Sequence, residues 1–495
     1  MLAKFTQPYS YWPSWLINLI LVIFGSVGVA LLTSLDAHPL VLLAVALGPA
    51  IGLIILFNPE WGLLLLVFMV YTRFSDALIG SLNAPSMAKP FIAFLVLVVV
   101  ARWFLFREAL TGWKYPLIFL GAYGLMGLLA MLHAASPEAV RSAMSDFAKD
   151  AVIMLIVTGL LKNTQSLRRV VWALLFSGIF LGSITTYQQI TGTFTNTYWG
   201  FAQATLSHII GEVNDYRIGG PGLGPNGYGQ FMLFLVPLAL DRLWNEPRRH
   251  FRVFAGWALT VSLLTVFFTF SRGVFLGLLV VLALMFIRRP PKPLALLVTL
   301  ALAVVLLQFL PARYMDRMST LVDFLPGSGQ DVRSEVSFRG RLSENLAGIQ
   351  MFLDHPILGV GPLNYKHHYQ SYARELGLER RREERSAHNL YLELASELGL
   401  VGLIWFGLLQ WVTFKGLREA QLNFRQAKMP SYESLAIAFA VAMVSFLITS
   451  IFRHMAYPRY VWLIYGIVLA IPDVSRQVLK NLPANHGGST GESTD

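Results

Sequence analysis

The sequence predicts an all-α polytopic integral membrane protein, and three observations support this fold class. Apolar residues make up 55% of the 495 residues, whereas Asp, Glu, Lys and Arg make up only 14%, well below the roughly 25% of a soluble domain. The mean hydropathy is +0.57. Apolar stretches recur along the whole length, and a single hydrophobic core stops growing at a few hundred residues. An ordinary soluble enzyme is therefore excluded.

Fourteen apolar segments are candidate membrane spans, each bounded by charge clusters or by Pro and Gly. They are 15–34, 40–57, 61–78, 90–106, 115–133, 148–162, 168–190, 226–244, 251–270, 273–287, 293–311, 389–414, 433–452 and 457–472. The first is too long for a typical signal-peptide core, so we expect it to remain as a span. Because 148–162 and 457–472 are short and 40–57 almost touches 61–78, the prediction is 12 to 14 transmembrane helices.

The distribution of Lys and Arg predicts the orientation. With the N-terminus in the cytoplasm, the inner loops hold 20 of the 39 basic residues and the outer loops hold 19, but 11 of those 19 lie in the long loop 312–388. Long translocated loops carry no weight in the positive-inside rule, so the relevant comparison is 20 against 8. Both termini are therefore expected in the cytoplasm, and the long connections 191–225 and 312–388 face outward. The net charge of +11 follows from topology, so nucleic-acid binding is an unnecessary explanation.

These spans and loops divide the chain into six parts. They are N-terminal transmembrane helices (1–190), an outer Arg/Gly-rich loop (191–225), central transmembrane helices (226–311), a long outer catalytic loop (312–388), C-terminal transmembrane helices (389–475) and a cytoplasmic tail (476–495).

Two amphipathic helices are expected inside the long loop. Leu342, Leu346, Ile349 and Leu353 recur at helical spacing before Pro356, and a second stripe, Tyr365, Tyr369, Tyr372 and Leu376, follows from Asn364. Such stripes fit helices that lie on the bilayer surface or on the tops of the spans. No internal repeat is evident, so an inverted-repeat transporter receives no support.

Arg217 precedes a glycine-rich run that contains Asn226 and reaches Gly229. This run cannot continue a helix, and exposed backbone N–H groups beside an arginine make an anion site. The Lys-Ser/Thr of a nucleotide P-loop is absent, so no nucleotide is implied. The alternative is a flexible re-entrant turn with an arginine that snorkels to the interface.

Arg272, in Ser271-Arg272-Gly273, lies between two apolar spans at the outer boundary. An ionisable residue at this depth is costly unless it faces the bundle interior, which favours function over a hairpin with a snorkelling arginine.

Two further candidates lie at the ends of the long loop. Arg339 and Arg341 open the first amphipathic helix, although a surface helix with exposed arginines explains them equally well. His388 joins the Arg-rich loop to the next span, and Asn389 or Ser386 can cap that span, which would place His388 in its first turn. The rivals for a catalytic histidine are His367 and His368, on the preceding helix.

Metal-binding motifs are missing. Neither an Asp-x-Asp pair nor a His-Glu-x-x-His motif occurs, and the chain has no Cys to form disulfides, thiolate nucleophiles or metal ligands. Arginines would have to neutralise a phosphate instead, and guanidinium groups hold phosphate oxygens bidentately. We therefore expect no metal and no cofactor.

In their order along the chain, these motifs resemble the O-antigen ligase superfamily, which includes O-antigen polymerases and bacterial protein O-oligosaccharyltransferases. The resemblance covers about 210–415 and rests on Arg217 with its Gly-Pro-Asn run, Ser271-Arg272-Gly273, Gly340-Arg341, Asp354-His355-Pro356-Ile357-Leu358-Gly359-Val360-Gly361, His388-Asn389-Leu390-Tyr391 and Glu397-Leu398-Gly399-Leu400-Val401-Gly402.

This resemblance implies a metal-independent, GT-C-like glycosyltransferase of the bacterial inner membrane. It would take a glycan from undecaprenyl diphosphate at the periplasmic face and transfer it to a lipid A-core sugar. Arg217 and Arg272 match arginines thought to hold the diphosphate, and His388 matches an essential histidine. Arg339, Arg341, Asn226 and Asn389 are the expected substrate-binding residues. The expected partners are the lipid-linked donor, the lipid A-core acceptor and membrane lipids, with neither nucleic acid nor nucleotide.

Two alternatives stay open. A polymerase or a protein O-oligosaccharyltransferase of the same superfamily would carry the same motifs. A polytopic glycolipid transporter would also have many spans, but it predicts polar residues scattered through them, whereas here the strong charges collect at the outer face.

Overall fold

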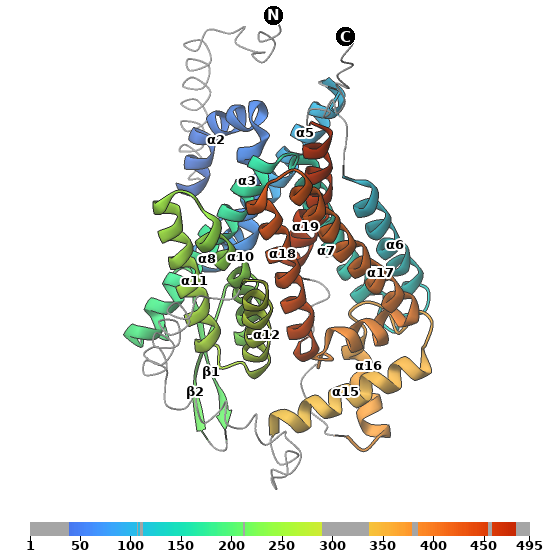
Figure 1. Ribbon diagram of the computed structural model, residues 1–495. Helices are drawn as coiled ribbons and strands as arrows, with labels where there is room; N and C mark the ends of the chain where they lie inside the picture. Colours follow the sequence, from blue (N-terminus) through green and yellow to red (C-terminus); the bar gives the residue numbers. More distant parts are fainter. Residues whose placement is uncertain are drawn as a thin grey trace, which may run out of the picture.

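The computed structural model describes residues 39–105, 107–108, 112–210, 213–289, 336–378, 385–453 and 458–481, and these residues form helices with one β-hairpin (Figure 1). The expected spans 15–34 and 293–311 lie outside the described residues, as do 312–335 and most of the C-terminal tail.

The first half of the described chain consists of helices, most of which lie close to the expected spans. Two differ: the expected span 61–78 is broken into α3 (Pro59–Tyr71) and α4 (Phe74–Leu82), and the helix expected at 148–162 begins at Pro137. Ser136 and Asn163 cap two of them by accepting hydrogen bonds from the backbone N–H groups of Ala139 (3.3 Å) and Ser166 (2.8 Å). The helices are α2 (Pro39–Phe57), α3 (Pro59–Tyr71), α4 (Phe74–Leu82), α5 (Ala88–Leu105), α6 (Lys114–Ala130), α7 (Pro137–Leu160) and α8 (Thr164–Thr191).

In the second half, another expected span is broken in two. Segment 226–244 forms α9 (Pro225–Leu233) and α10 (Leu235–Asn245), because Pro237 has no N–H to donate to the Leu233 carbonyl. The others are α11 (Arg249–Phe268), α12 (Arg272–Arg288), α15 (Val336–Asp354), α16 (Tyr365–Glu375), α17 (Leu390–Gln426), α18 (Pro430–Thr449), the 3₁₀ turn η3 (Ser450–Phe452) and α19 (Arg459–Lys480).

A β-hairpin corrects the all-α expectation for the connection 191–225. Strands β1 (Gln203–Ile210) and β2 (Val213–Gly219) pair antiparallel with Thr205 opposite Arg217. The glycine-rich run that dominates the sequence pattern of this connection follows the hairpin. The pattern therefore gave no indication of two adjacent strands. The hairpin lies at the same end of the molecule as α15 and α16 (Figure 1).

The membrane character is evident from helix length and composition. Among the described residues, 6 helices are long and apolar enough to cross a bilayer, or up to 7 if Leu47–Phe57 and Pro59–Tyr71, bent by 118°, make one span. The 6 include α17 and α19, which pack side by side, with α7 against α19. The chain is therefore a polytopic membrane protein, and 12 to 14 spans stay a prediction.

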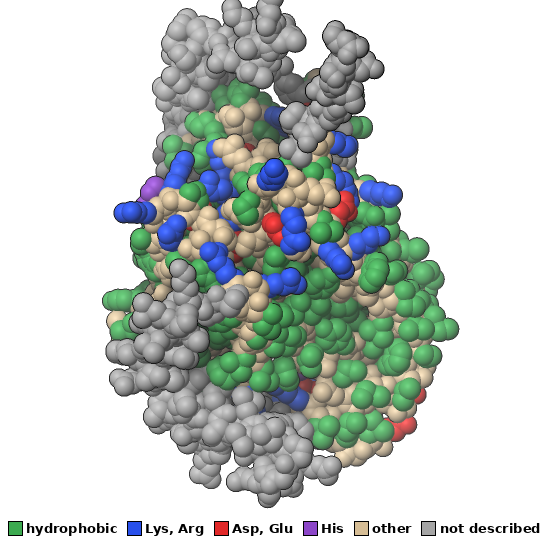
Figure 2. All heavy atoms as spheres, viewed as in Figure 1, with side chains coloured by type: hydrophobic (Ala, Val, Ile, Leu, Met, Phe, Trp, Pro, Cys, Tyr) green, Lys and Arg blue, Asp and Glu red, His purple; other side chains and the backbone are tan. Residues whose placement is uncertain are grey.

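Basic residues gather at one end of the molecule, away from α15 and α16 (Figure 2). There Lys162 pairs with Glu108 at 2.6 Å, Arg168 pairs with Glu246, and Arg289 donates to Asn245 at 2.9 Å. These contacts join loops that the basic-residue count placed on one side. An apolar belt lies below them in Figure 2.

The stripe on α15 faces away from the protein. Leu342, Leu346, Ile349 and Leu353 are exposed, whereas Ala347 and Gly348 face inward, where they let α15 approach Tyr365 of α16 and Leu392 of α17. The expectation that this stripe could rest on the tops of the spans is therefore wrong, and the bilayer surface stays as the prediction. The tyrosine stripe of α16, in contrast, is buried against α15.

Candidate functional site

Arg217 joins three segments at the end of the molecule that carries the hairpin. Its side chain is 8% exposed. Nε donates to the Thr269 carbonyl at 2.9 Å, and Nη2 donates to Oδ1 of Asn226 at 2.7 Å. The guanidinium therefore connects β2, the first turn of α9 and the turn between α11 and α12. The re-entrant turn with a snorkelling arginine is wrong, because Arg217 is buried and bonded within the protein.

The glycine-rich run after Arg217 has two parts. Gly220 and Leu223 exchange backbone hydrogen bonds of 3.0 Å in a tight turn, in which Gly222 has φ 58°. From Pro225 onward the run is helical, contrary to expectation. Its glycine at position 227 permits close packing, because a Cβ there would lie 2.7 Å from Cζ of Arg453.

Arg272 begins α12 after a sharp turn. Phe270 is fully buried with φ 51°, and Ser271 occupies the N-cap position. This geometry turns the chain so that Arg272 lines a small hollow together with Asn226, Arg341 and Arg453. The alternative interpretation, a turn between two spans whose arginine only snorkels to the headgroups, does not describe this arrangement.

The arginine hollow, defined by Asn226, Arg272, Arg341 and Arg453, collects three guanidinium groups from separate elements. None of its described lining residues is acidic. Burial lowers the pKa of Arg453, while Tyr460 and Glu393 raise it. A guanidinium group is protonated throughout the physiological range. Three cations around one hollow favour an anionic ligand with several oxygens, such as a diphosphate.

Arg453 was missed by the reasoning from sequence. It follows an apolar span, and an arginine in that position is normally an interfacial anchor. The signal that could have found it is its place directly after the expected span 433–452, which ends on the same expected side as Arg272.

His388 lies at the other end of the long loop, next to a buried acid. Its Nε2 is 4.0 Å from Oε2 of Glu344 on α15, whose side chain is 2% exposed, and Arg385 approaches the other carboxylate oxygen at 3.4 Å. The imidazole is 34% exposed, so a substrate can reach it. Glu344 was also missed, because a glutamate on the polar side of an amphipathic helix normally indicates a solvated face.

Of the two residues expected to cap α17, Asn389 and Ser386, the structure shows Asn389 in this role. Asn389 caps α17 by accepting hydrogen bonds from Tyr391 N (2.9 Å) and Leu392 N (3.2 Å), so it has a structural role. His388 therefore lies just before the cap with φ 46°, not in the first turn.

The remaining expected residues are placed as follows. Arg341 lines the arginine hollow, whereas Arg339 is exposed and lies outside it. His367 is exposed, and His368 packs near Tyr372 within α16. Neither histidine lines the hollow.

The two glycine-containing motifs pack directly against each other. Val360 N donates to the Ser396 carbonyl at 2.8 Å, and Leu400 N donates to the Pro356 carbonyl at 2.8 Å. The close approach needs Gly359 and Gly399, since a Cβ on either would lie 2.4 or 2.3 Å from backbone atoms of the other segment. The motifs therefore anchor the long loop on α17, which is kinked at Gly399.

Glu397 completes this anchor. Its carboxylate accepts hydrogen bonds from the backbone N–H groups of Leu363 (2.9 Å) and Tyr365 (3.4 Å), at the start of α16. Within the described ranges, no group of three or more His, Asp or Glu residues is arranged to hold a metal ion.

A comparison with known families identifies the part of the chain that carries this site. Residues 257–407 match the family model described as O-antigen ligase. This segment is therefore similar to the O-antigen ligase family. The comparison with curated proteins finds no match.

The segment that matches the O-antigen ligase model covers much of the site but not all of it. It contains Arg272, Arg341, Glu344 and His388, as well as both glycine motifs. Arg217, Asn226 and Arg453 lie outside the matched residues. Asn226 and Arg453 line the same hollow, and Arg217 is bonded to Asn226.

Proposed function

We propose that the protein is an O-antigen ligase of lipopolysaccharide biosynthesis. It transfers a glycan from undecaprenyl diphosphate to a sugar of lipid A-core. One observation carries this proposal: α15 contributes both Arg341, which lines the arginine hollow, and Glu344, the acid that faces His388.

The spacing on α15 suits a reaction between two substrates. Arg341 in the hollow and Glu344 beside His388 are three residues apart, which is roughly 4.5 Å along a helix axis. With the diphosphate in the hollow, the anomeric carbon of the attached sugar would therefore lie between the guanidinium groups and the imidazole.

Arg272, Arg341 and Arg453 bind the diphosphate oxygens and stabilise the charge that grows on them as the glycosidic bond breaks. Asn226 faces the same hollow, and Arg217 holds its amide in place through the hydrogen bond of 2.7 Å. Arg217 thus positions the site and does not line it.

His388 acts as the general base. The oxygen of the acceptor hydroxyl attacks the anomeric carbon, its proton passes to the imidazole, and the electron pair of the broken C–O bond leaves with the diphosphate. Such a base contributes about 10² to 10⁴ in rate. Glu344 stabilises the imidazolium that forms, as the acidic member of a catalytic triad does.

The displacement inverts the anomeric carbon, because the site offers no enzyme nucleophile in the proposed path. Arginines supply the positive charge, so the reaction needs neither metal nor cofactor. We place the protein in the bacterial inner membrane, with the arginine hollow facing the periplasm and both termini in the cytoplasm. The grouping of basic side chains at the opposite end supports this orientation (Figure 2).

Reconstitution tests the proposed reaction. Purified protein is incubated with a polymeric glycan linked to undecaprenyl diphosphate as the donor and with lipid A-core as the sole acceptor, without added nucleotide. We expect glycan on lipid A-core. Parallel reactions offer a second lipid-linked glycan or a Ser/Thr peptide, and transfer to one of these alone would establish a polymerase or a protein O-oligosaccharyltransferase instead.

A further inference from the structure

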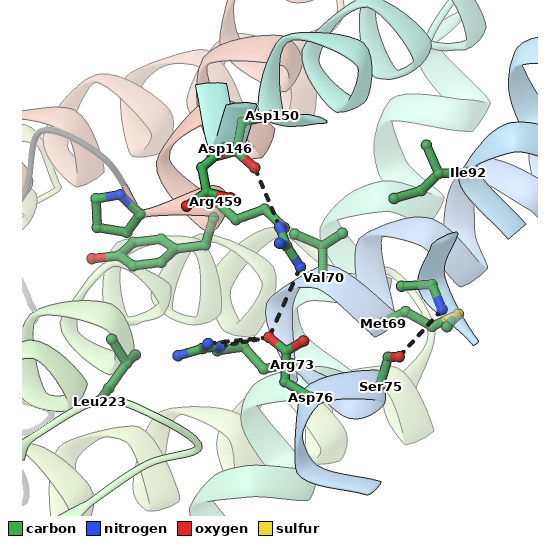
Figure 3. A pocket seen from close by; sticks show the side chains of 13 residues that line it. Met69, Val70, Arg73, Ser75, Asp76, Ile92, Asp146, Asp150, Leu223 and Arg459 are labelled. Carbon is green, nitrogen blue, oxygen red and sulfur yellow. Dashed lines mark hydrogen bonds and ion pairs between the residues drawn. The ribbon is translucent and has the colours of Figure 1, made fainter. Parts of the chain in front are cut away.

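A second cavity lies beside the arginine hollow, across the glycine-rich turn. Its volume is about 220 Å³, and its wall comes from α3, α4, α5, α7 and the start of α19 (Figure 3). Leu223 lines this cavity, whereas Asn226, three residues later, lines the hollow. One short segment therefore separates the two sites.

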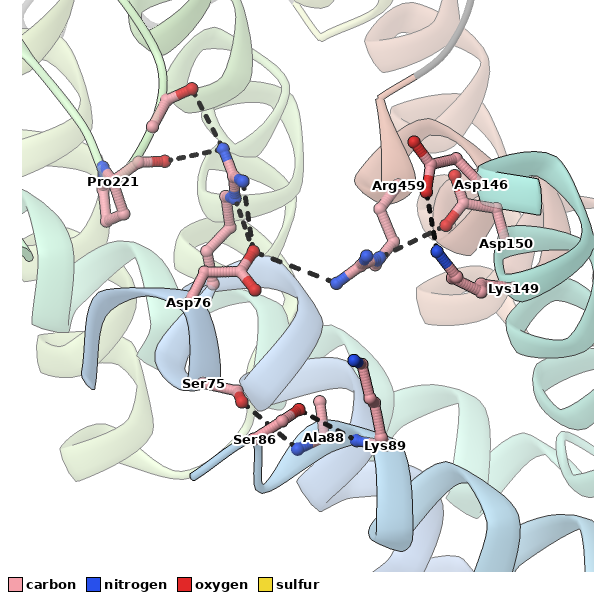
Figure 4. Close-up of polar contacts among 12 residues, drawn as sticks. Ser75, Asp76, Ser86, Ala88, Lys89, Asp146, Lys149, Asp150, Pro221 and Arg459 are labelled. Carbon is pink, nitrogen blue, oxygen red and sulfur yellow. Dashed lines mark hydrogen bonds and ion pairs between the residues drawn. The ribbon is translucent and has the colours of Figure 1, made fainter. Parts of the chain in front are cut away.

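A bridge of ion pairs runs along the cavity wall. The carboxylate of Asp76 forms ion pairs with Arg73 at 3.1 Å and with Arg459 at 3.8 Å. Nε of Arg459 also donates a hydrogen bond of 3.2 Å to Asp150 (Figures 3 and 4). Arg73 also donates to the Pro221 carbonyl at 3.1 Å, which joins the bridge to the glycine-rich turn (Figure 4).

This bridge is not closed off from a ligand. The side chains of Arg73, Asp76 and Arg459 keep 37%, 38% and 37% of their surface exposed, while Asp150 is buried beneath them. These three side chains line the cavity, so their charged groups are accessible to a ligand in it.

The composition of the wall indicates the class of ligand. Asp146 is paired with Lys149 at 2.8 Å, and the remaining charged wall residues, Arg73 and Arg459 against Asp76 and Asp150, are formally neutral. This balance disfavours a second diphosphate. In the portion of the chain that the structure covers, these carboxylates do not form a metal-binding group either.

A neutral hydroxylated ligand satisfies both kinds of side chain. A hydroxyl group donates to a carboxylate and accepts from a guanidinium. The apolar part of the wall, which includes Val70, Ile92 and Pro458, suits the C–H faces of a sugar ring. Because the volume is below the roughly 300 to 1,000 Å³ of pockets for drug-sized ligands, the occupant is on the order of one sugar ring.

We propose that this cavity binds one sugar residue of a glycan substrate through its hydroxyl groups, next to the diphosphate in the arginine hollow. The inference rests on the proposed function, because it assigns a sugar subsite to the same reaction.

Two substitutions on α5 provide the test. Ala88 lines the cavity, so Ala88→Leu fills it without removing an ion pair, whereas Ala93 is exposed on the same helix, so Ala93→Leu is a matched control. As a second variant, Asp76→Asn keeps the volume but removes one carboxylate acceptor. Comparable thermal unfolding of the purified variants establishes that each is folded.

Saturation-transfer NMR measures binding of free glucose, galactose, rhamnose and N-acetylglucosamine to the protein in lipid nanodiscs. We expect at least one sugar to bind the native protein and Ala93→Leu, and to bind Ala88→Leu and Asp76→Asn about tenfold more weakly. Added pyrophosphate should not displace it.

The inference is overturned if no sugar binds, if both cavity variants bind normally, or if pyrophosphate competes. This readout needs no turnover. Failure of the proposed function would instead appear as sugar binding without glycan transfer in the reconstitution.

Discussion

The carboxylate of Glu344 lies 4.0 Å from Nε2 of His388, which places a buried acid beside a half-exposed imidazole. The two residues come from different elements, and α15 also carries Arg341 into the arginine hollow. One helix therefore couples the proposed base to the proposed diphosphate site.

Glu344→Gln should reduce turnover while leaving donor binding intact. The amide keeps the size of the side chain but no longer stabilises an imidazolium, so we expect kcat to fall roughly ten- to hundredfold, about 1.4 to 2.7 kcal/mol of barrier. Steady-state transfer and donor binding by the purified variant measure the two effects. Asp354→Asn, an exposed change on the same helix, is the control, and equal kcat for both variants would remove Glu344 from the mechanism.

Arg453→Lys should weaken donor binding although it preserves the charge. Lysine cannot reproduce bidentate contacts to phosphate oxygens, so we expect binding of the lipid-linked diphosphate to weaken about tenfold. The matched control is Arg248→Lys, because Arg248 is exposed and lies outside the hollow. Unchanged donor affinity in folded Arg453→Lys would assign Arg453 a packing role against Gly227.

Gly359→Ala should destabilise the protein more than Gly377→Ala. Both glycines have positive φ, 66° and 64°, so both substitutions carry a backbone cost of about 1 to 2 kcal/mol. A Cβ at position 359 would in addition lie 2.4 Å from the Glu397 carbonyl carbon, whereas nothing lies within 4 Å at position 377. Thermal unfolding compares the two, and equal midpoints would contradict the packing of the two motifs.

Transfer should persist in EDTA. The proposed reaction uses Arg272, Arg341 and Arg453 for the charge that a metal would otherwise supply, so chelation removes nothing that it needs. The reconstituted reaction is measured with and without chelator. Complete loss of transfer, restored by magnesium or manganese, would contradict the assignment of charge stabilisation to the three arginines.

The sequence predicts where most helices lie, because long apolar segments depend on composition that is local in the chain. It also predicts α16, since the spacing of Tyr365, Tyr369 and Tyr372 matches one helix face that the structure buries. The domain boundaries stay a prediction.

The parts that escaped prediction depend on contacts between distant segments. Glu344 and Arg453 have the local patterns of a solvated helix face and an interfacial anchor, and only the fold brings them to His388 and Arg272. The hairpin at 203–219 pairs residues close in sequence, but its alternation is short and the glycines after it dominate the pattern.

The central claim is that Arg272 holds the donor diphosphate and His388 removes the acceptor proton, and one contrast tests it most directly. Because His388 has φ 46°, His388→Asn is better tolerated than Ala at this position, so it tests the chemistry with little strain.

Donor binding and glycan transfer are measured for His388→Asn and Arg272→Lys at matched levels of folded protein. We predict that His388→Asn binds donor normally and loses about 10² to 10⁴ in transfer, whereas Arg272→Lys loses both binding and transfer. Native transfer by both variants would contradict the catalytic assignment while leaving the fold untouched.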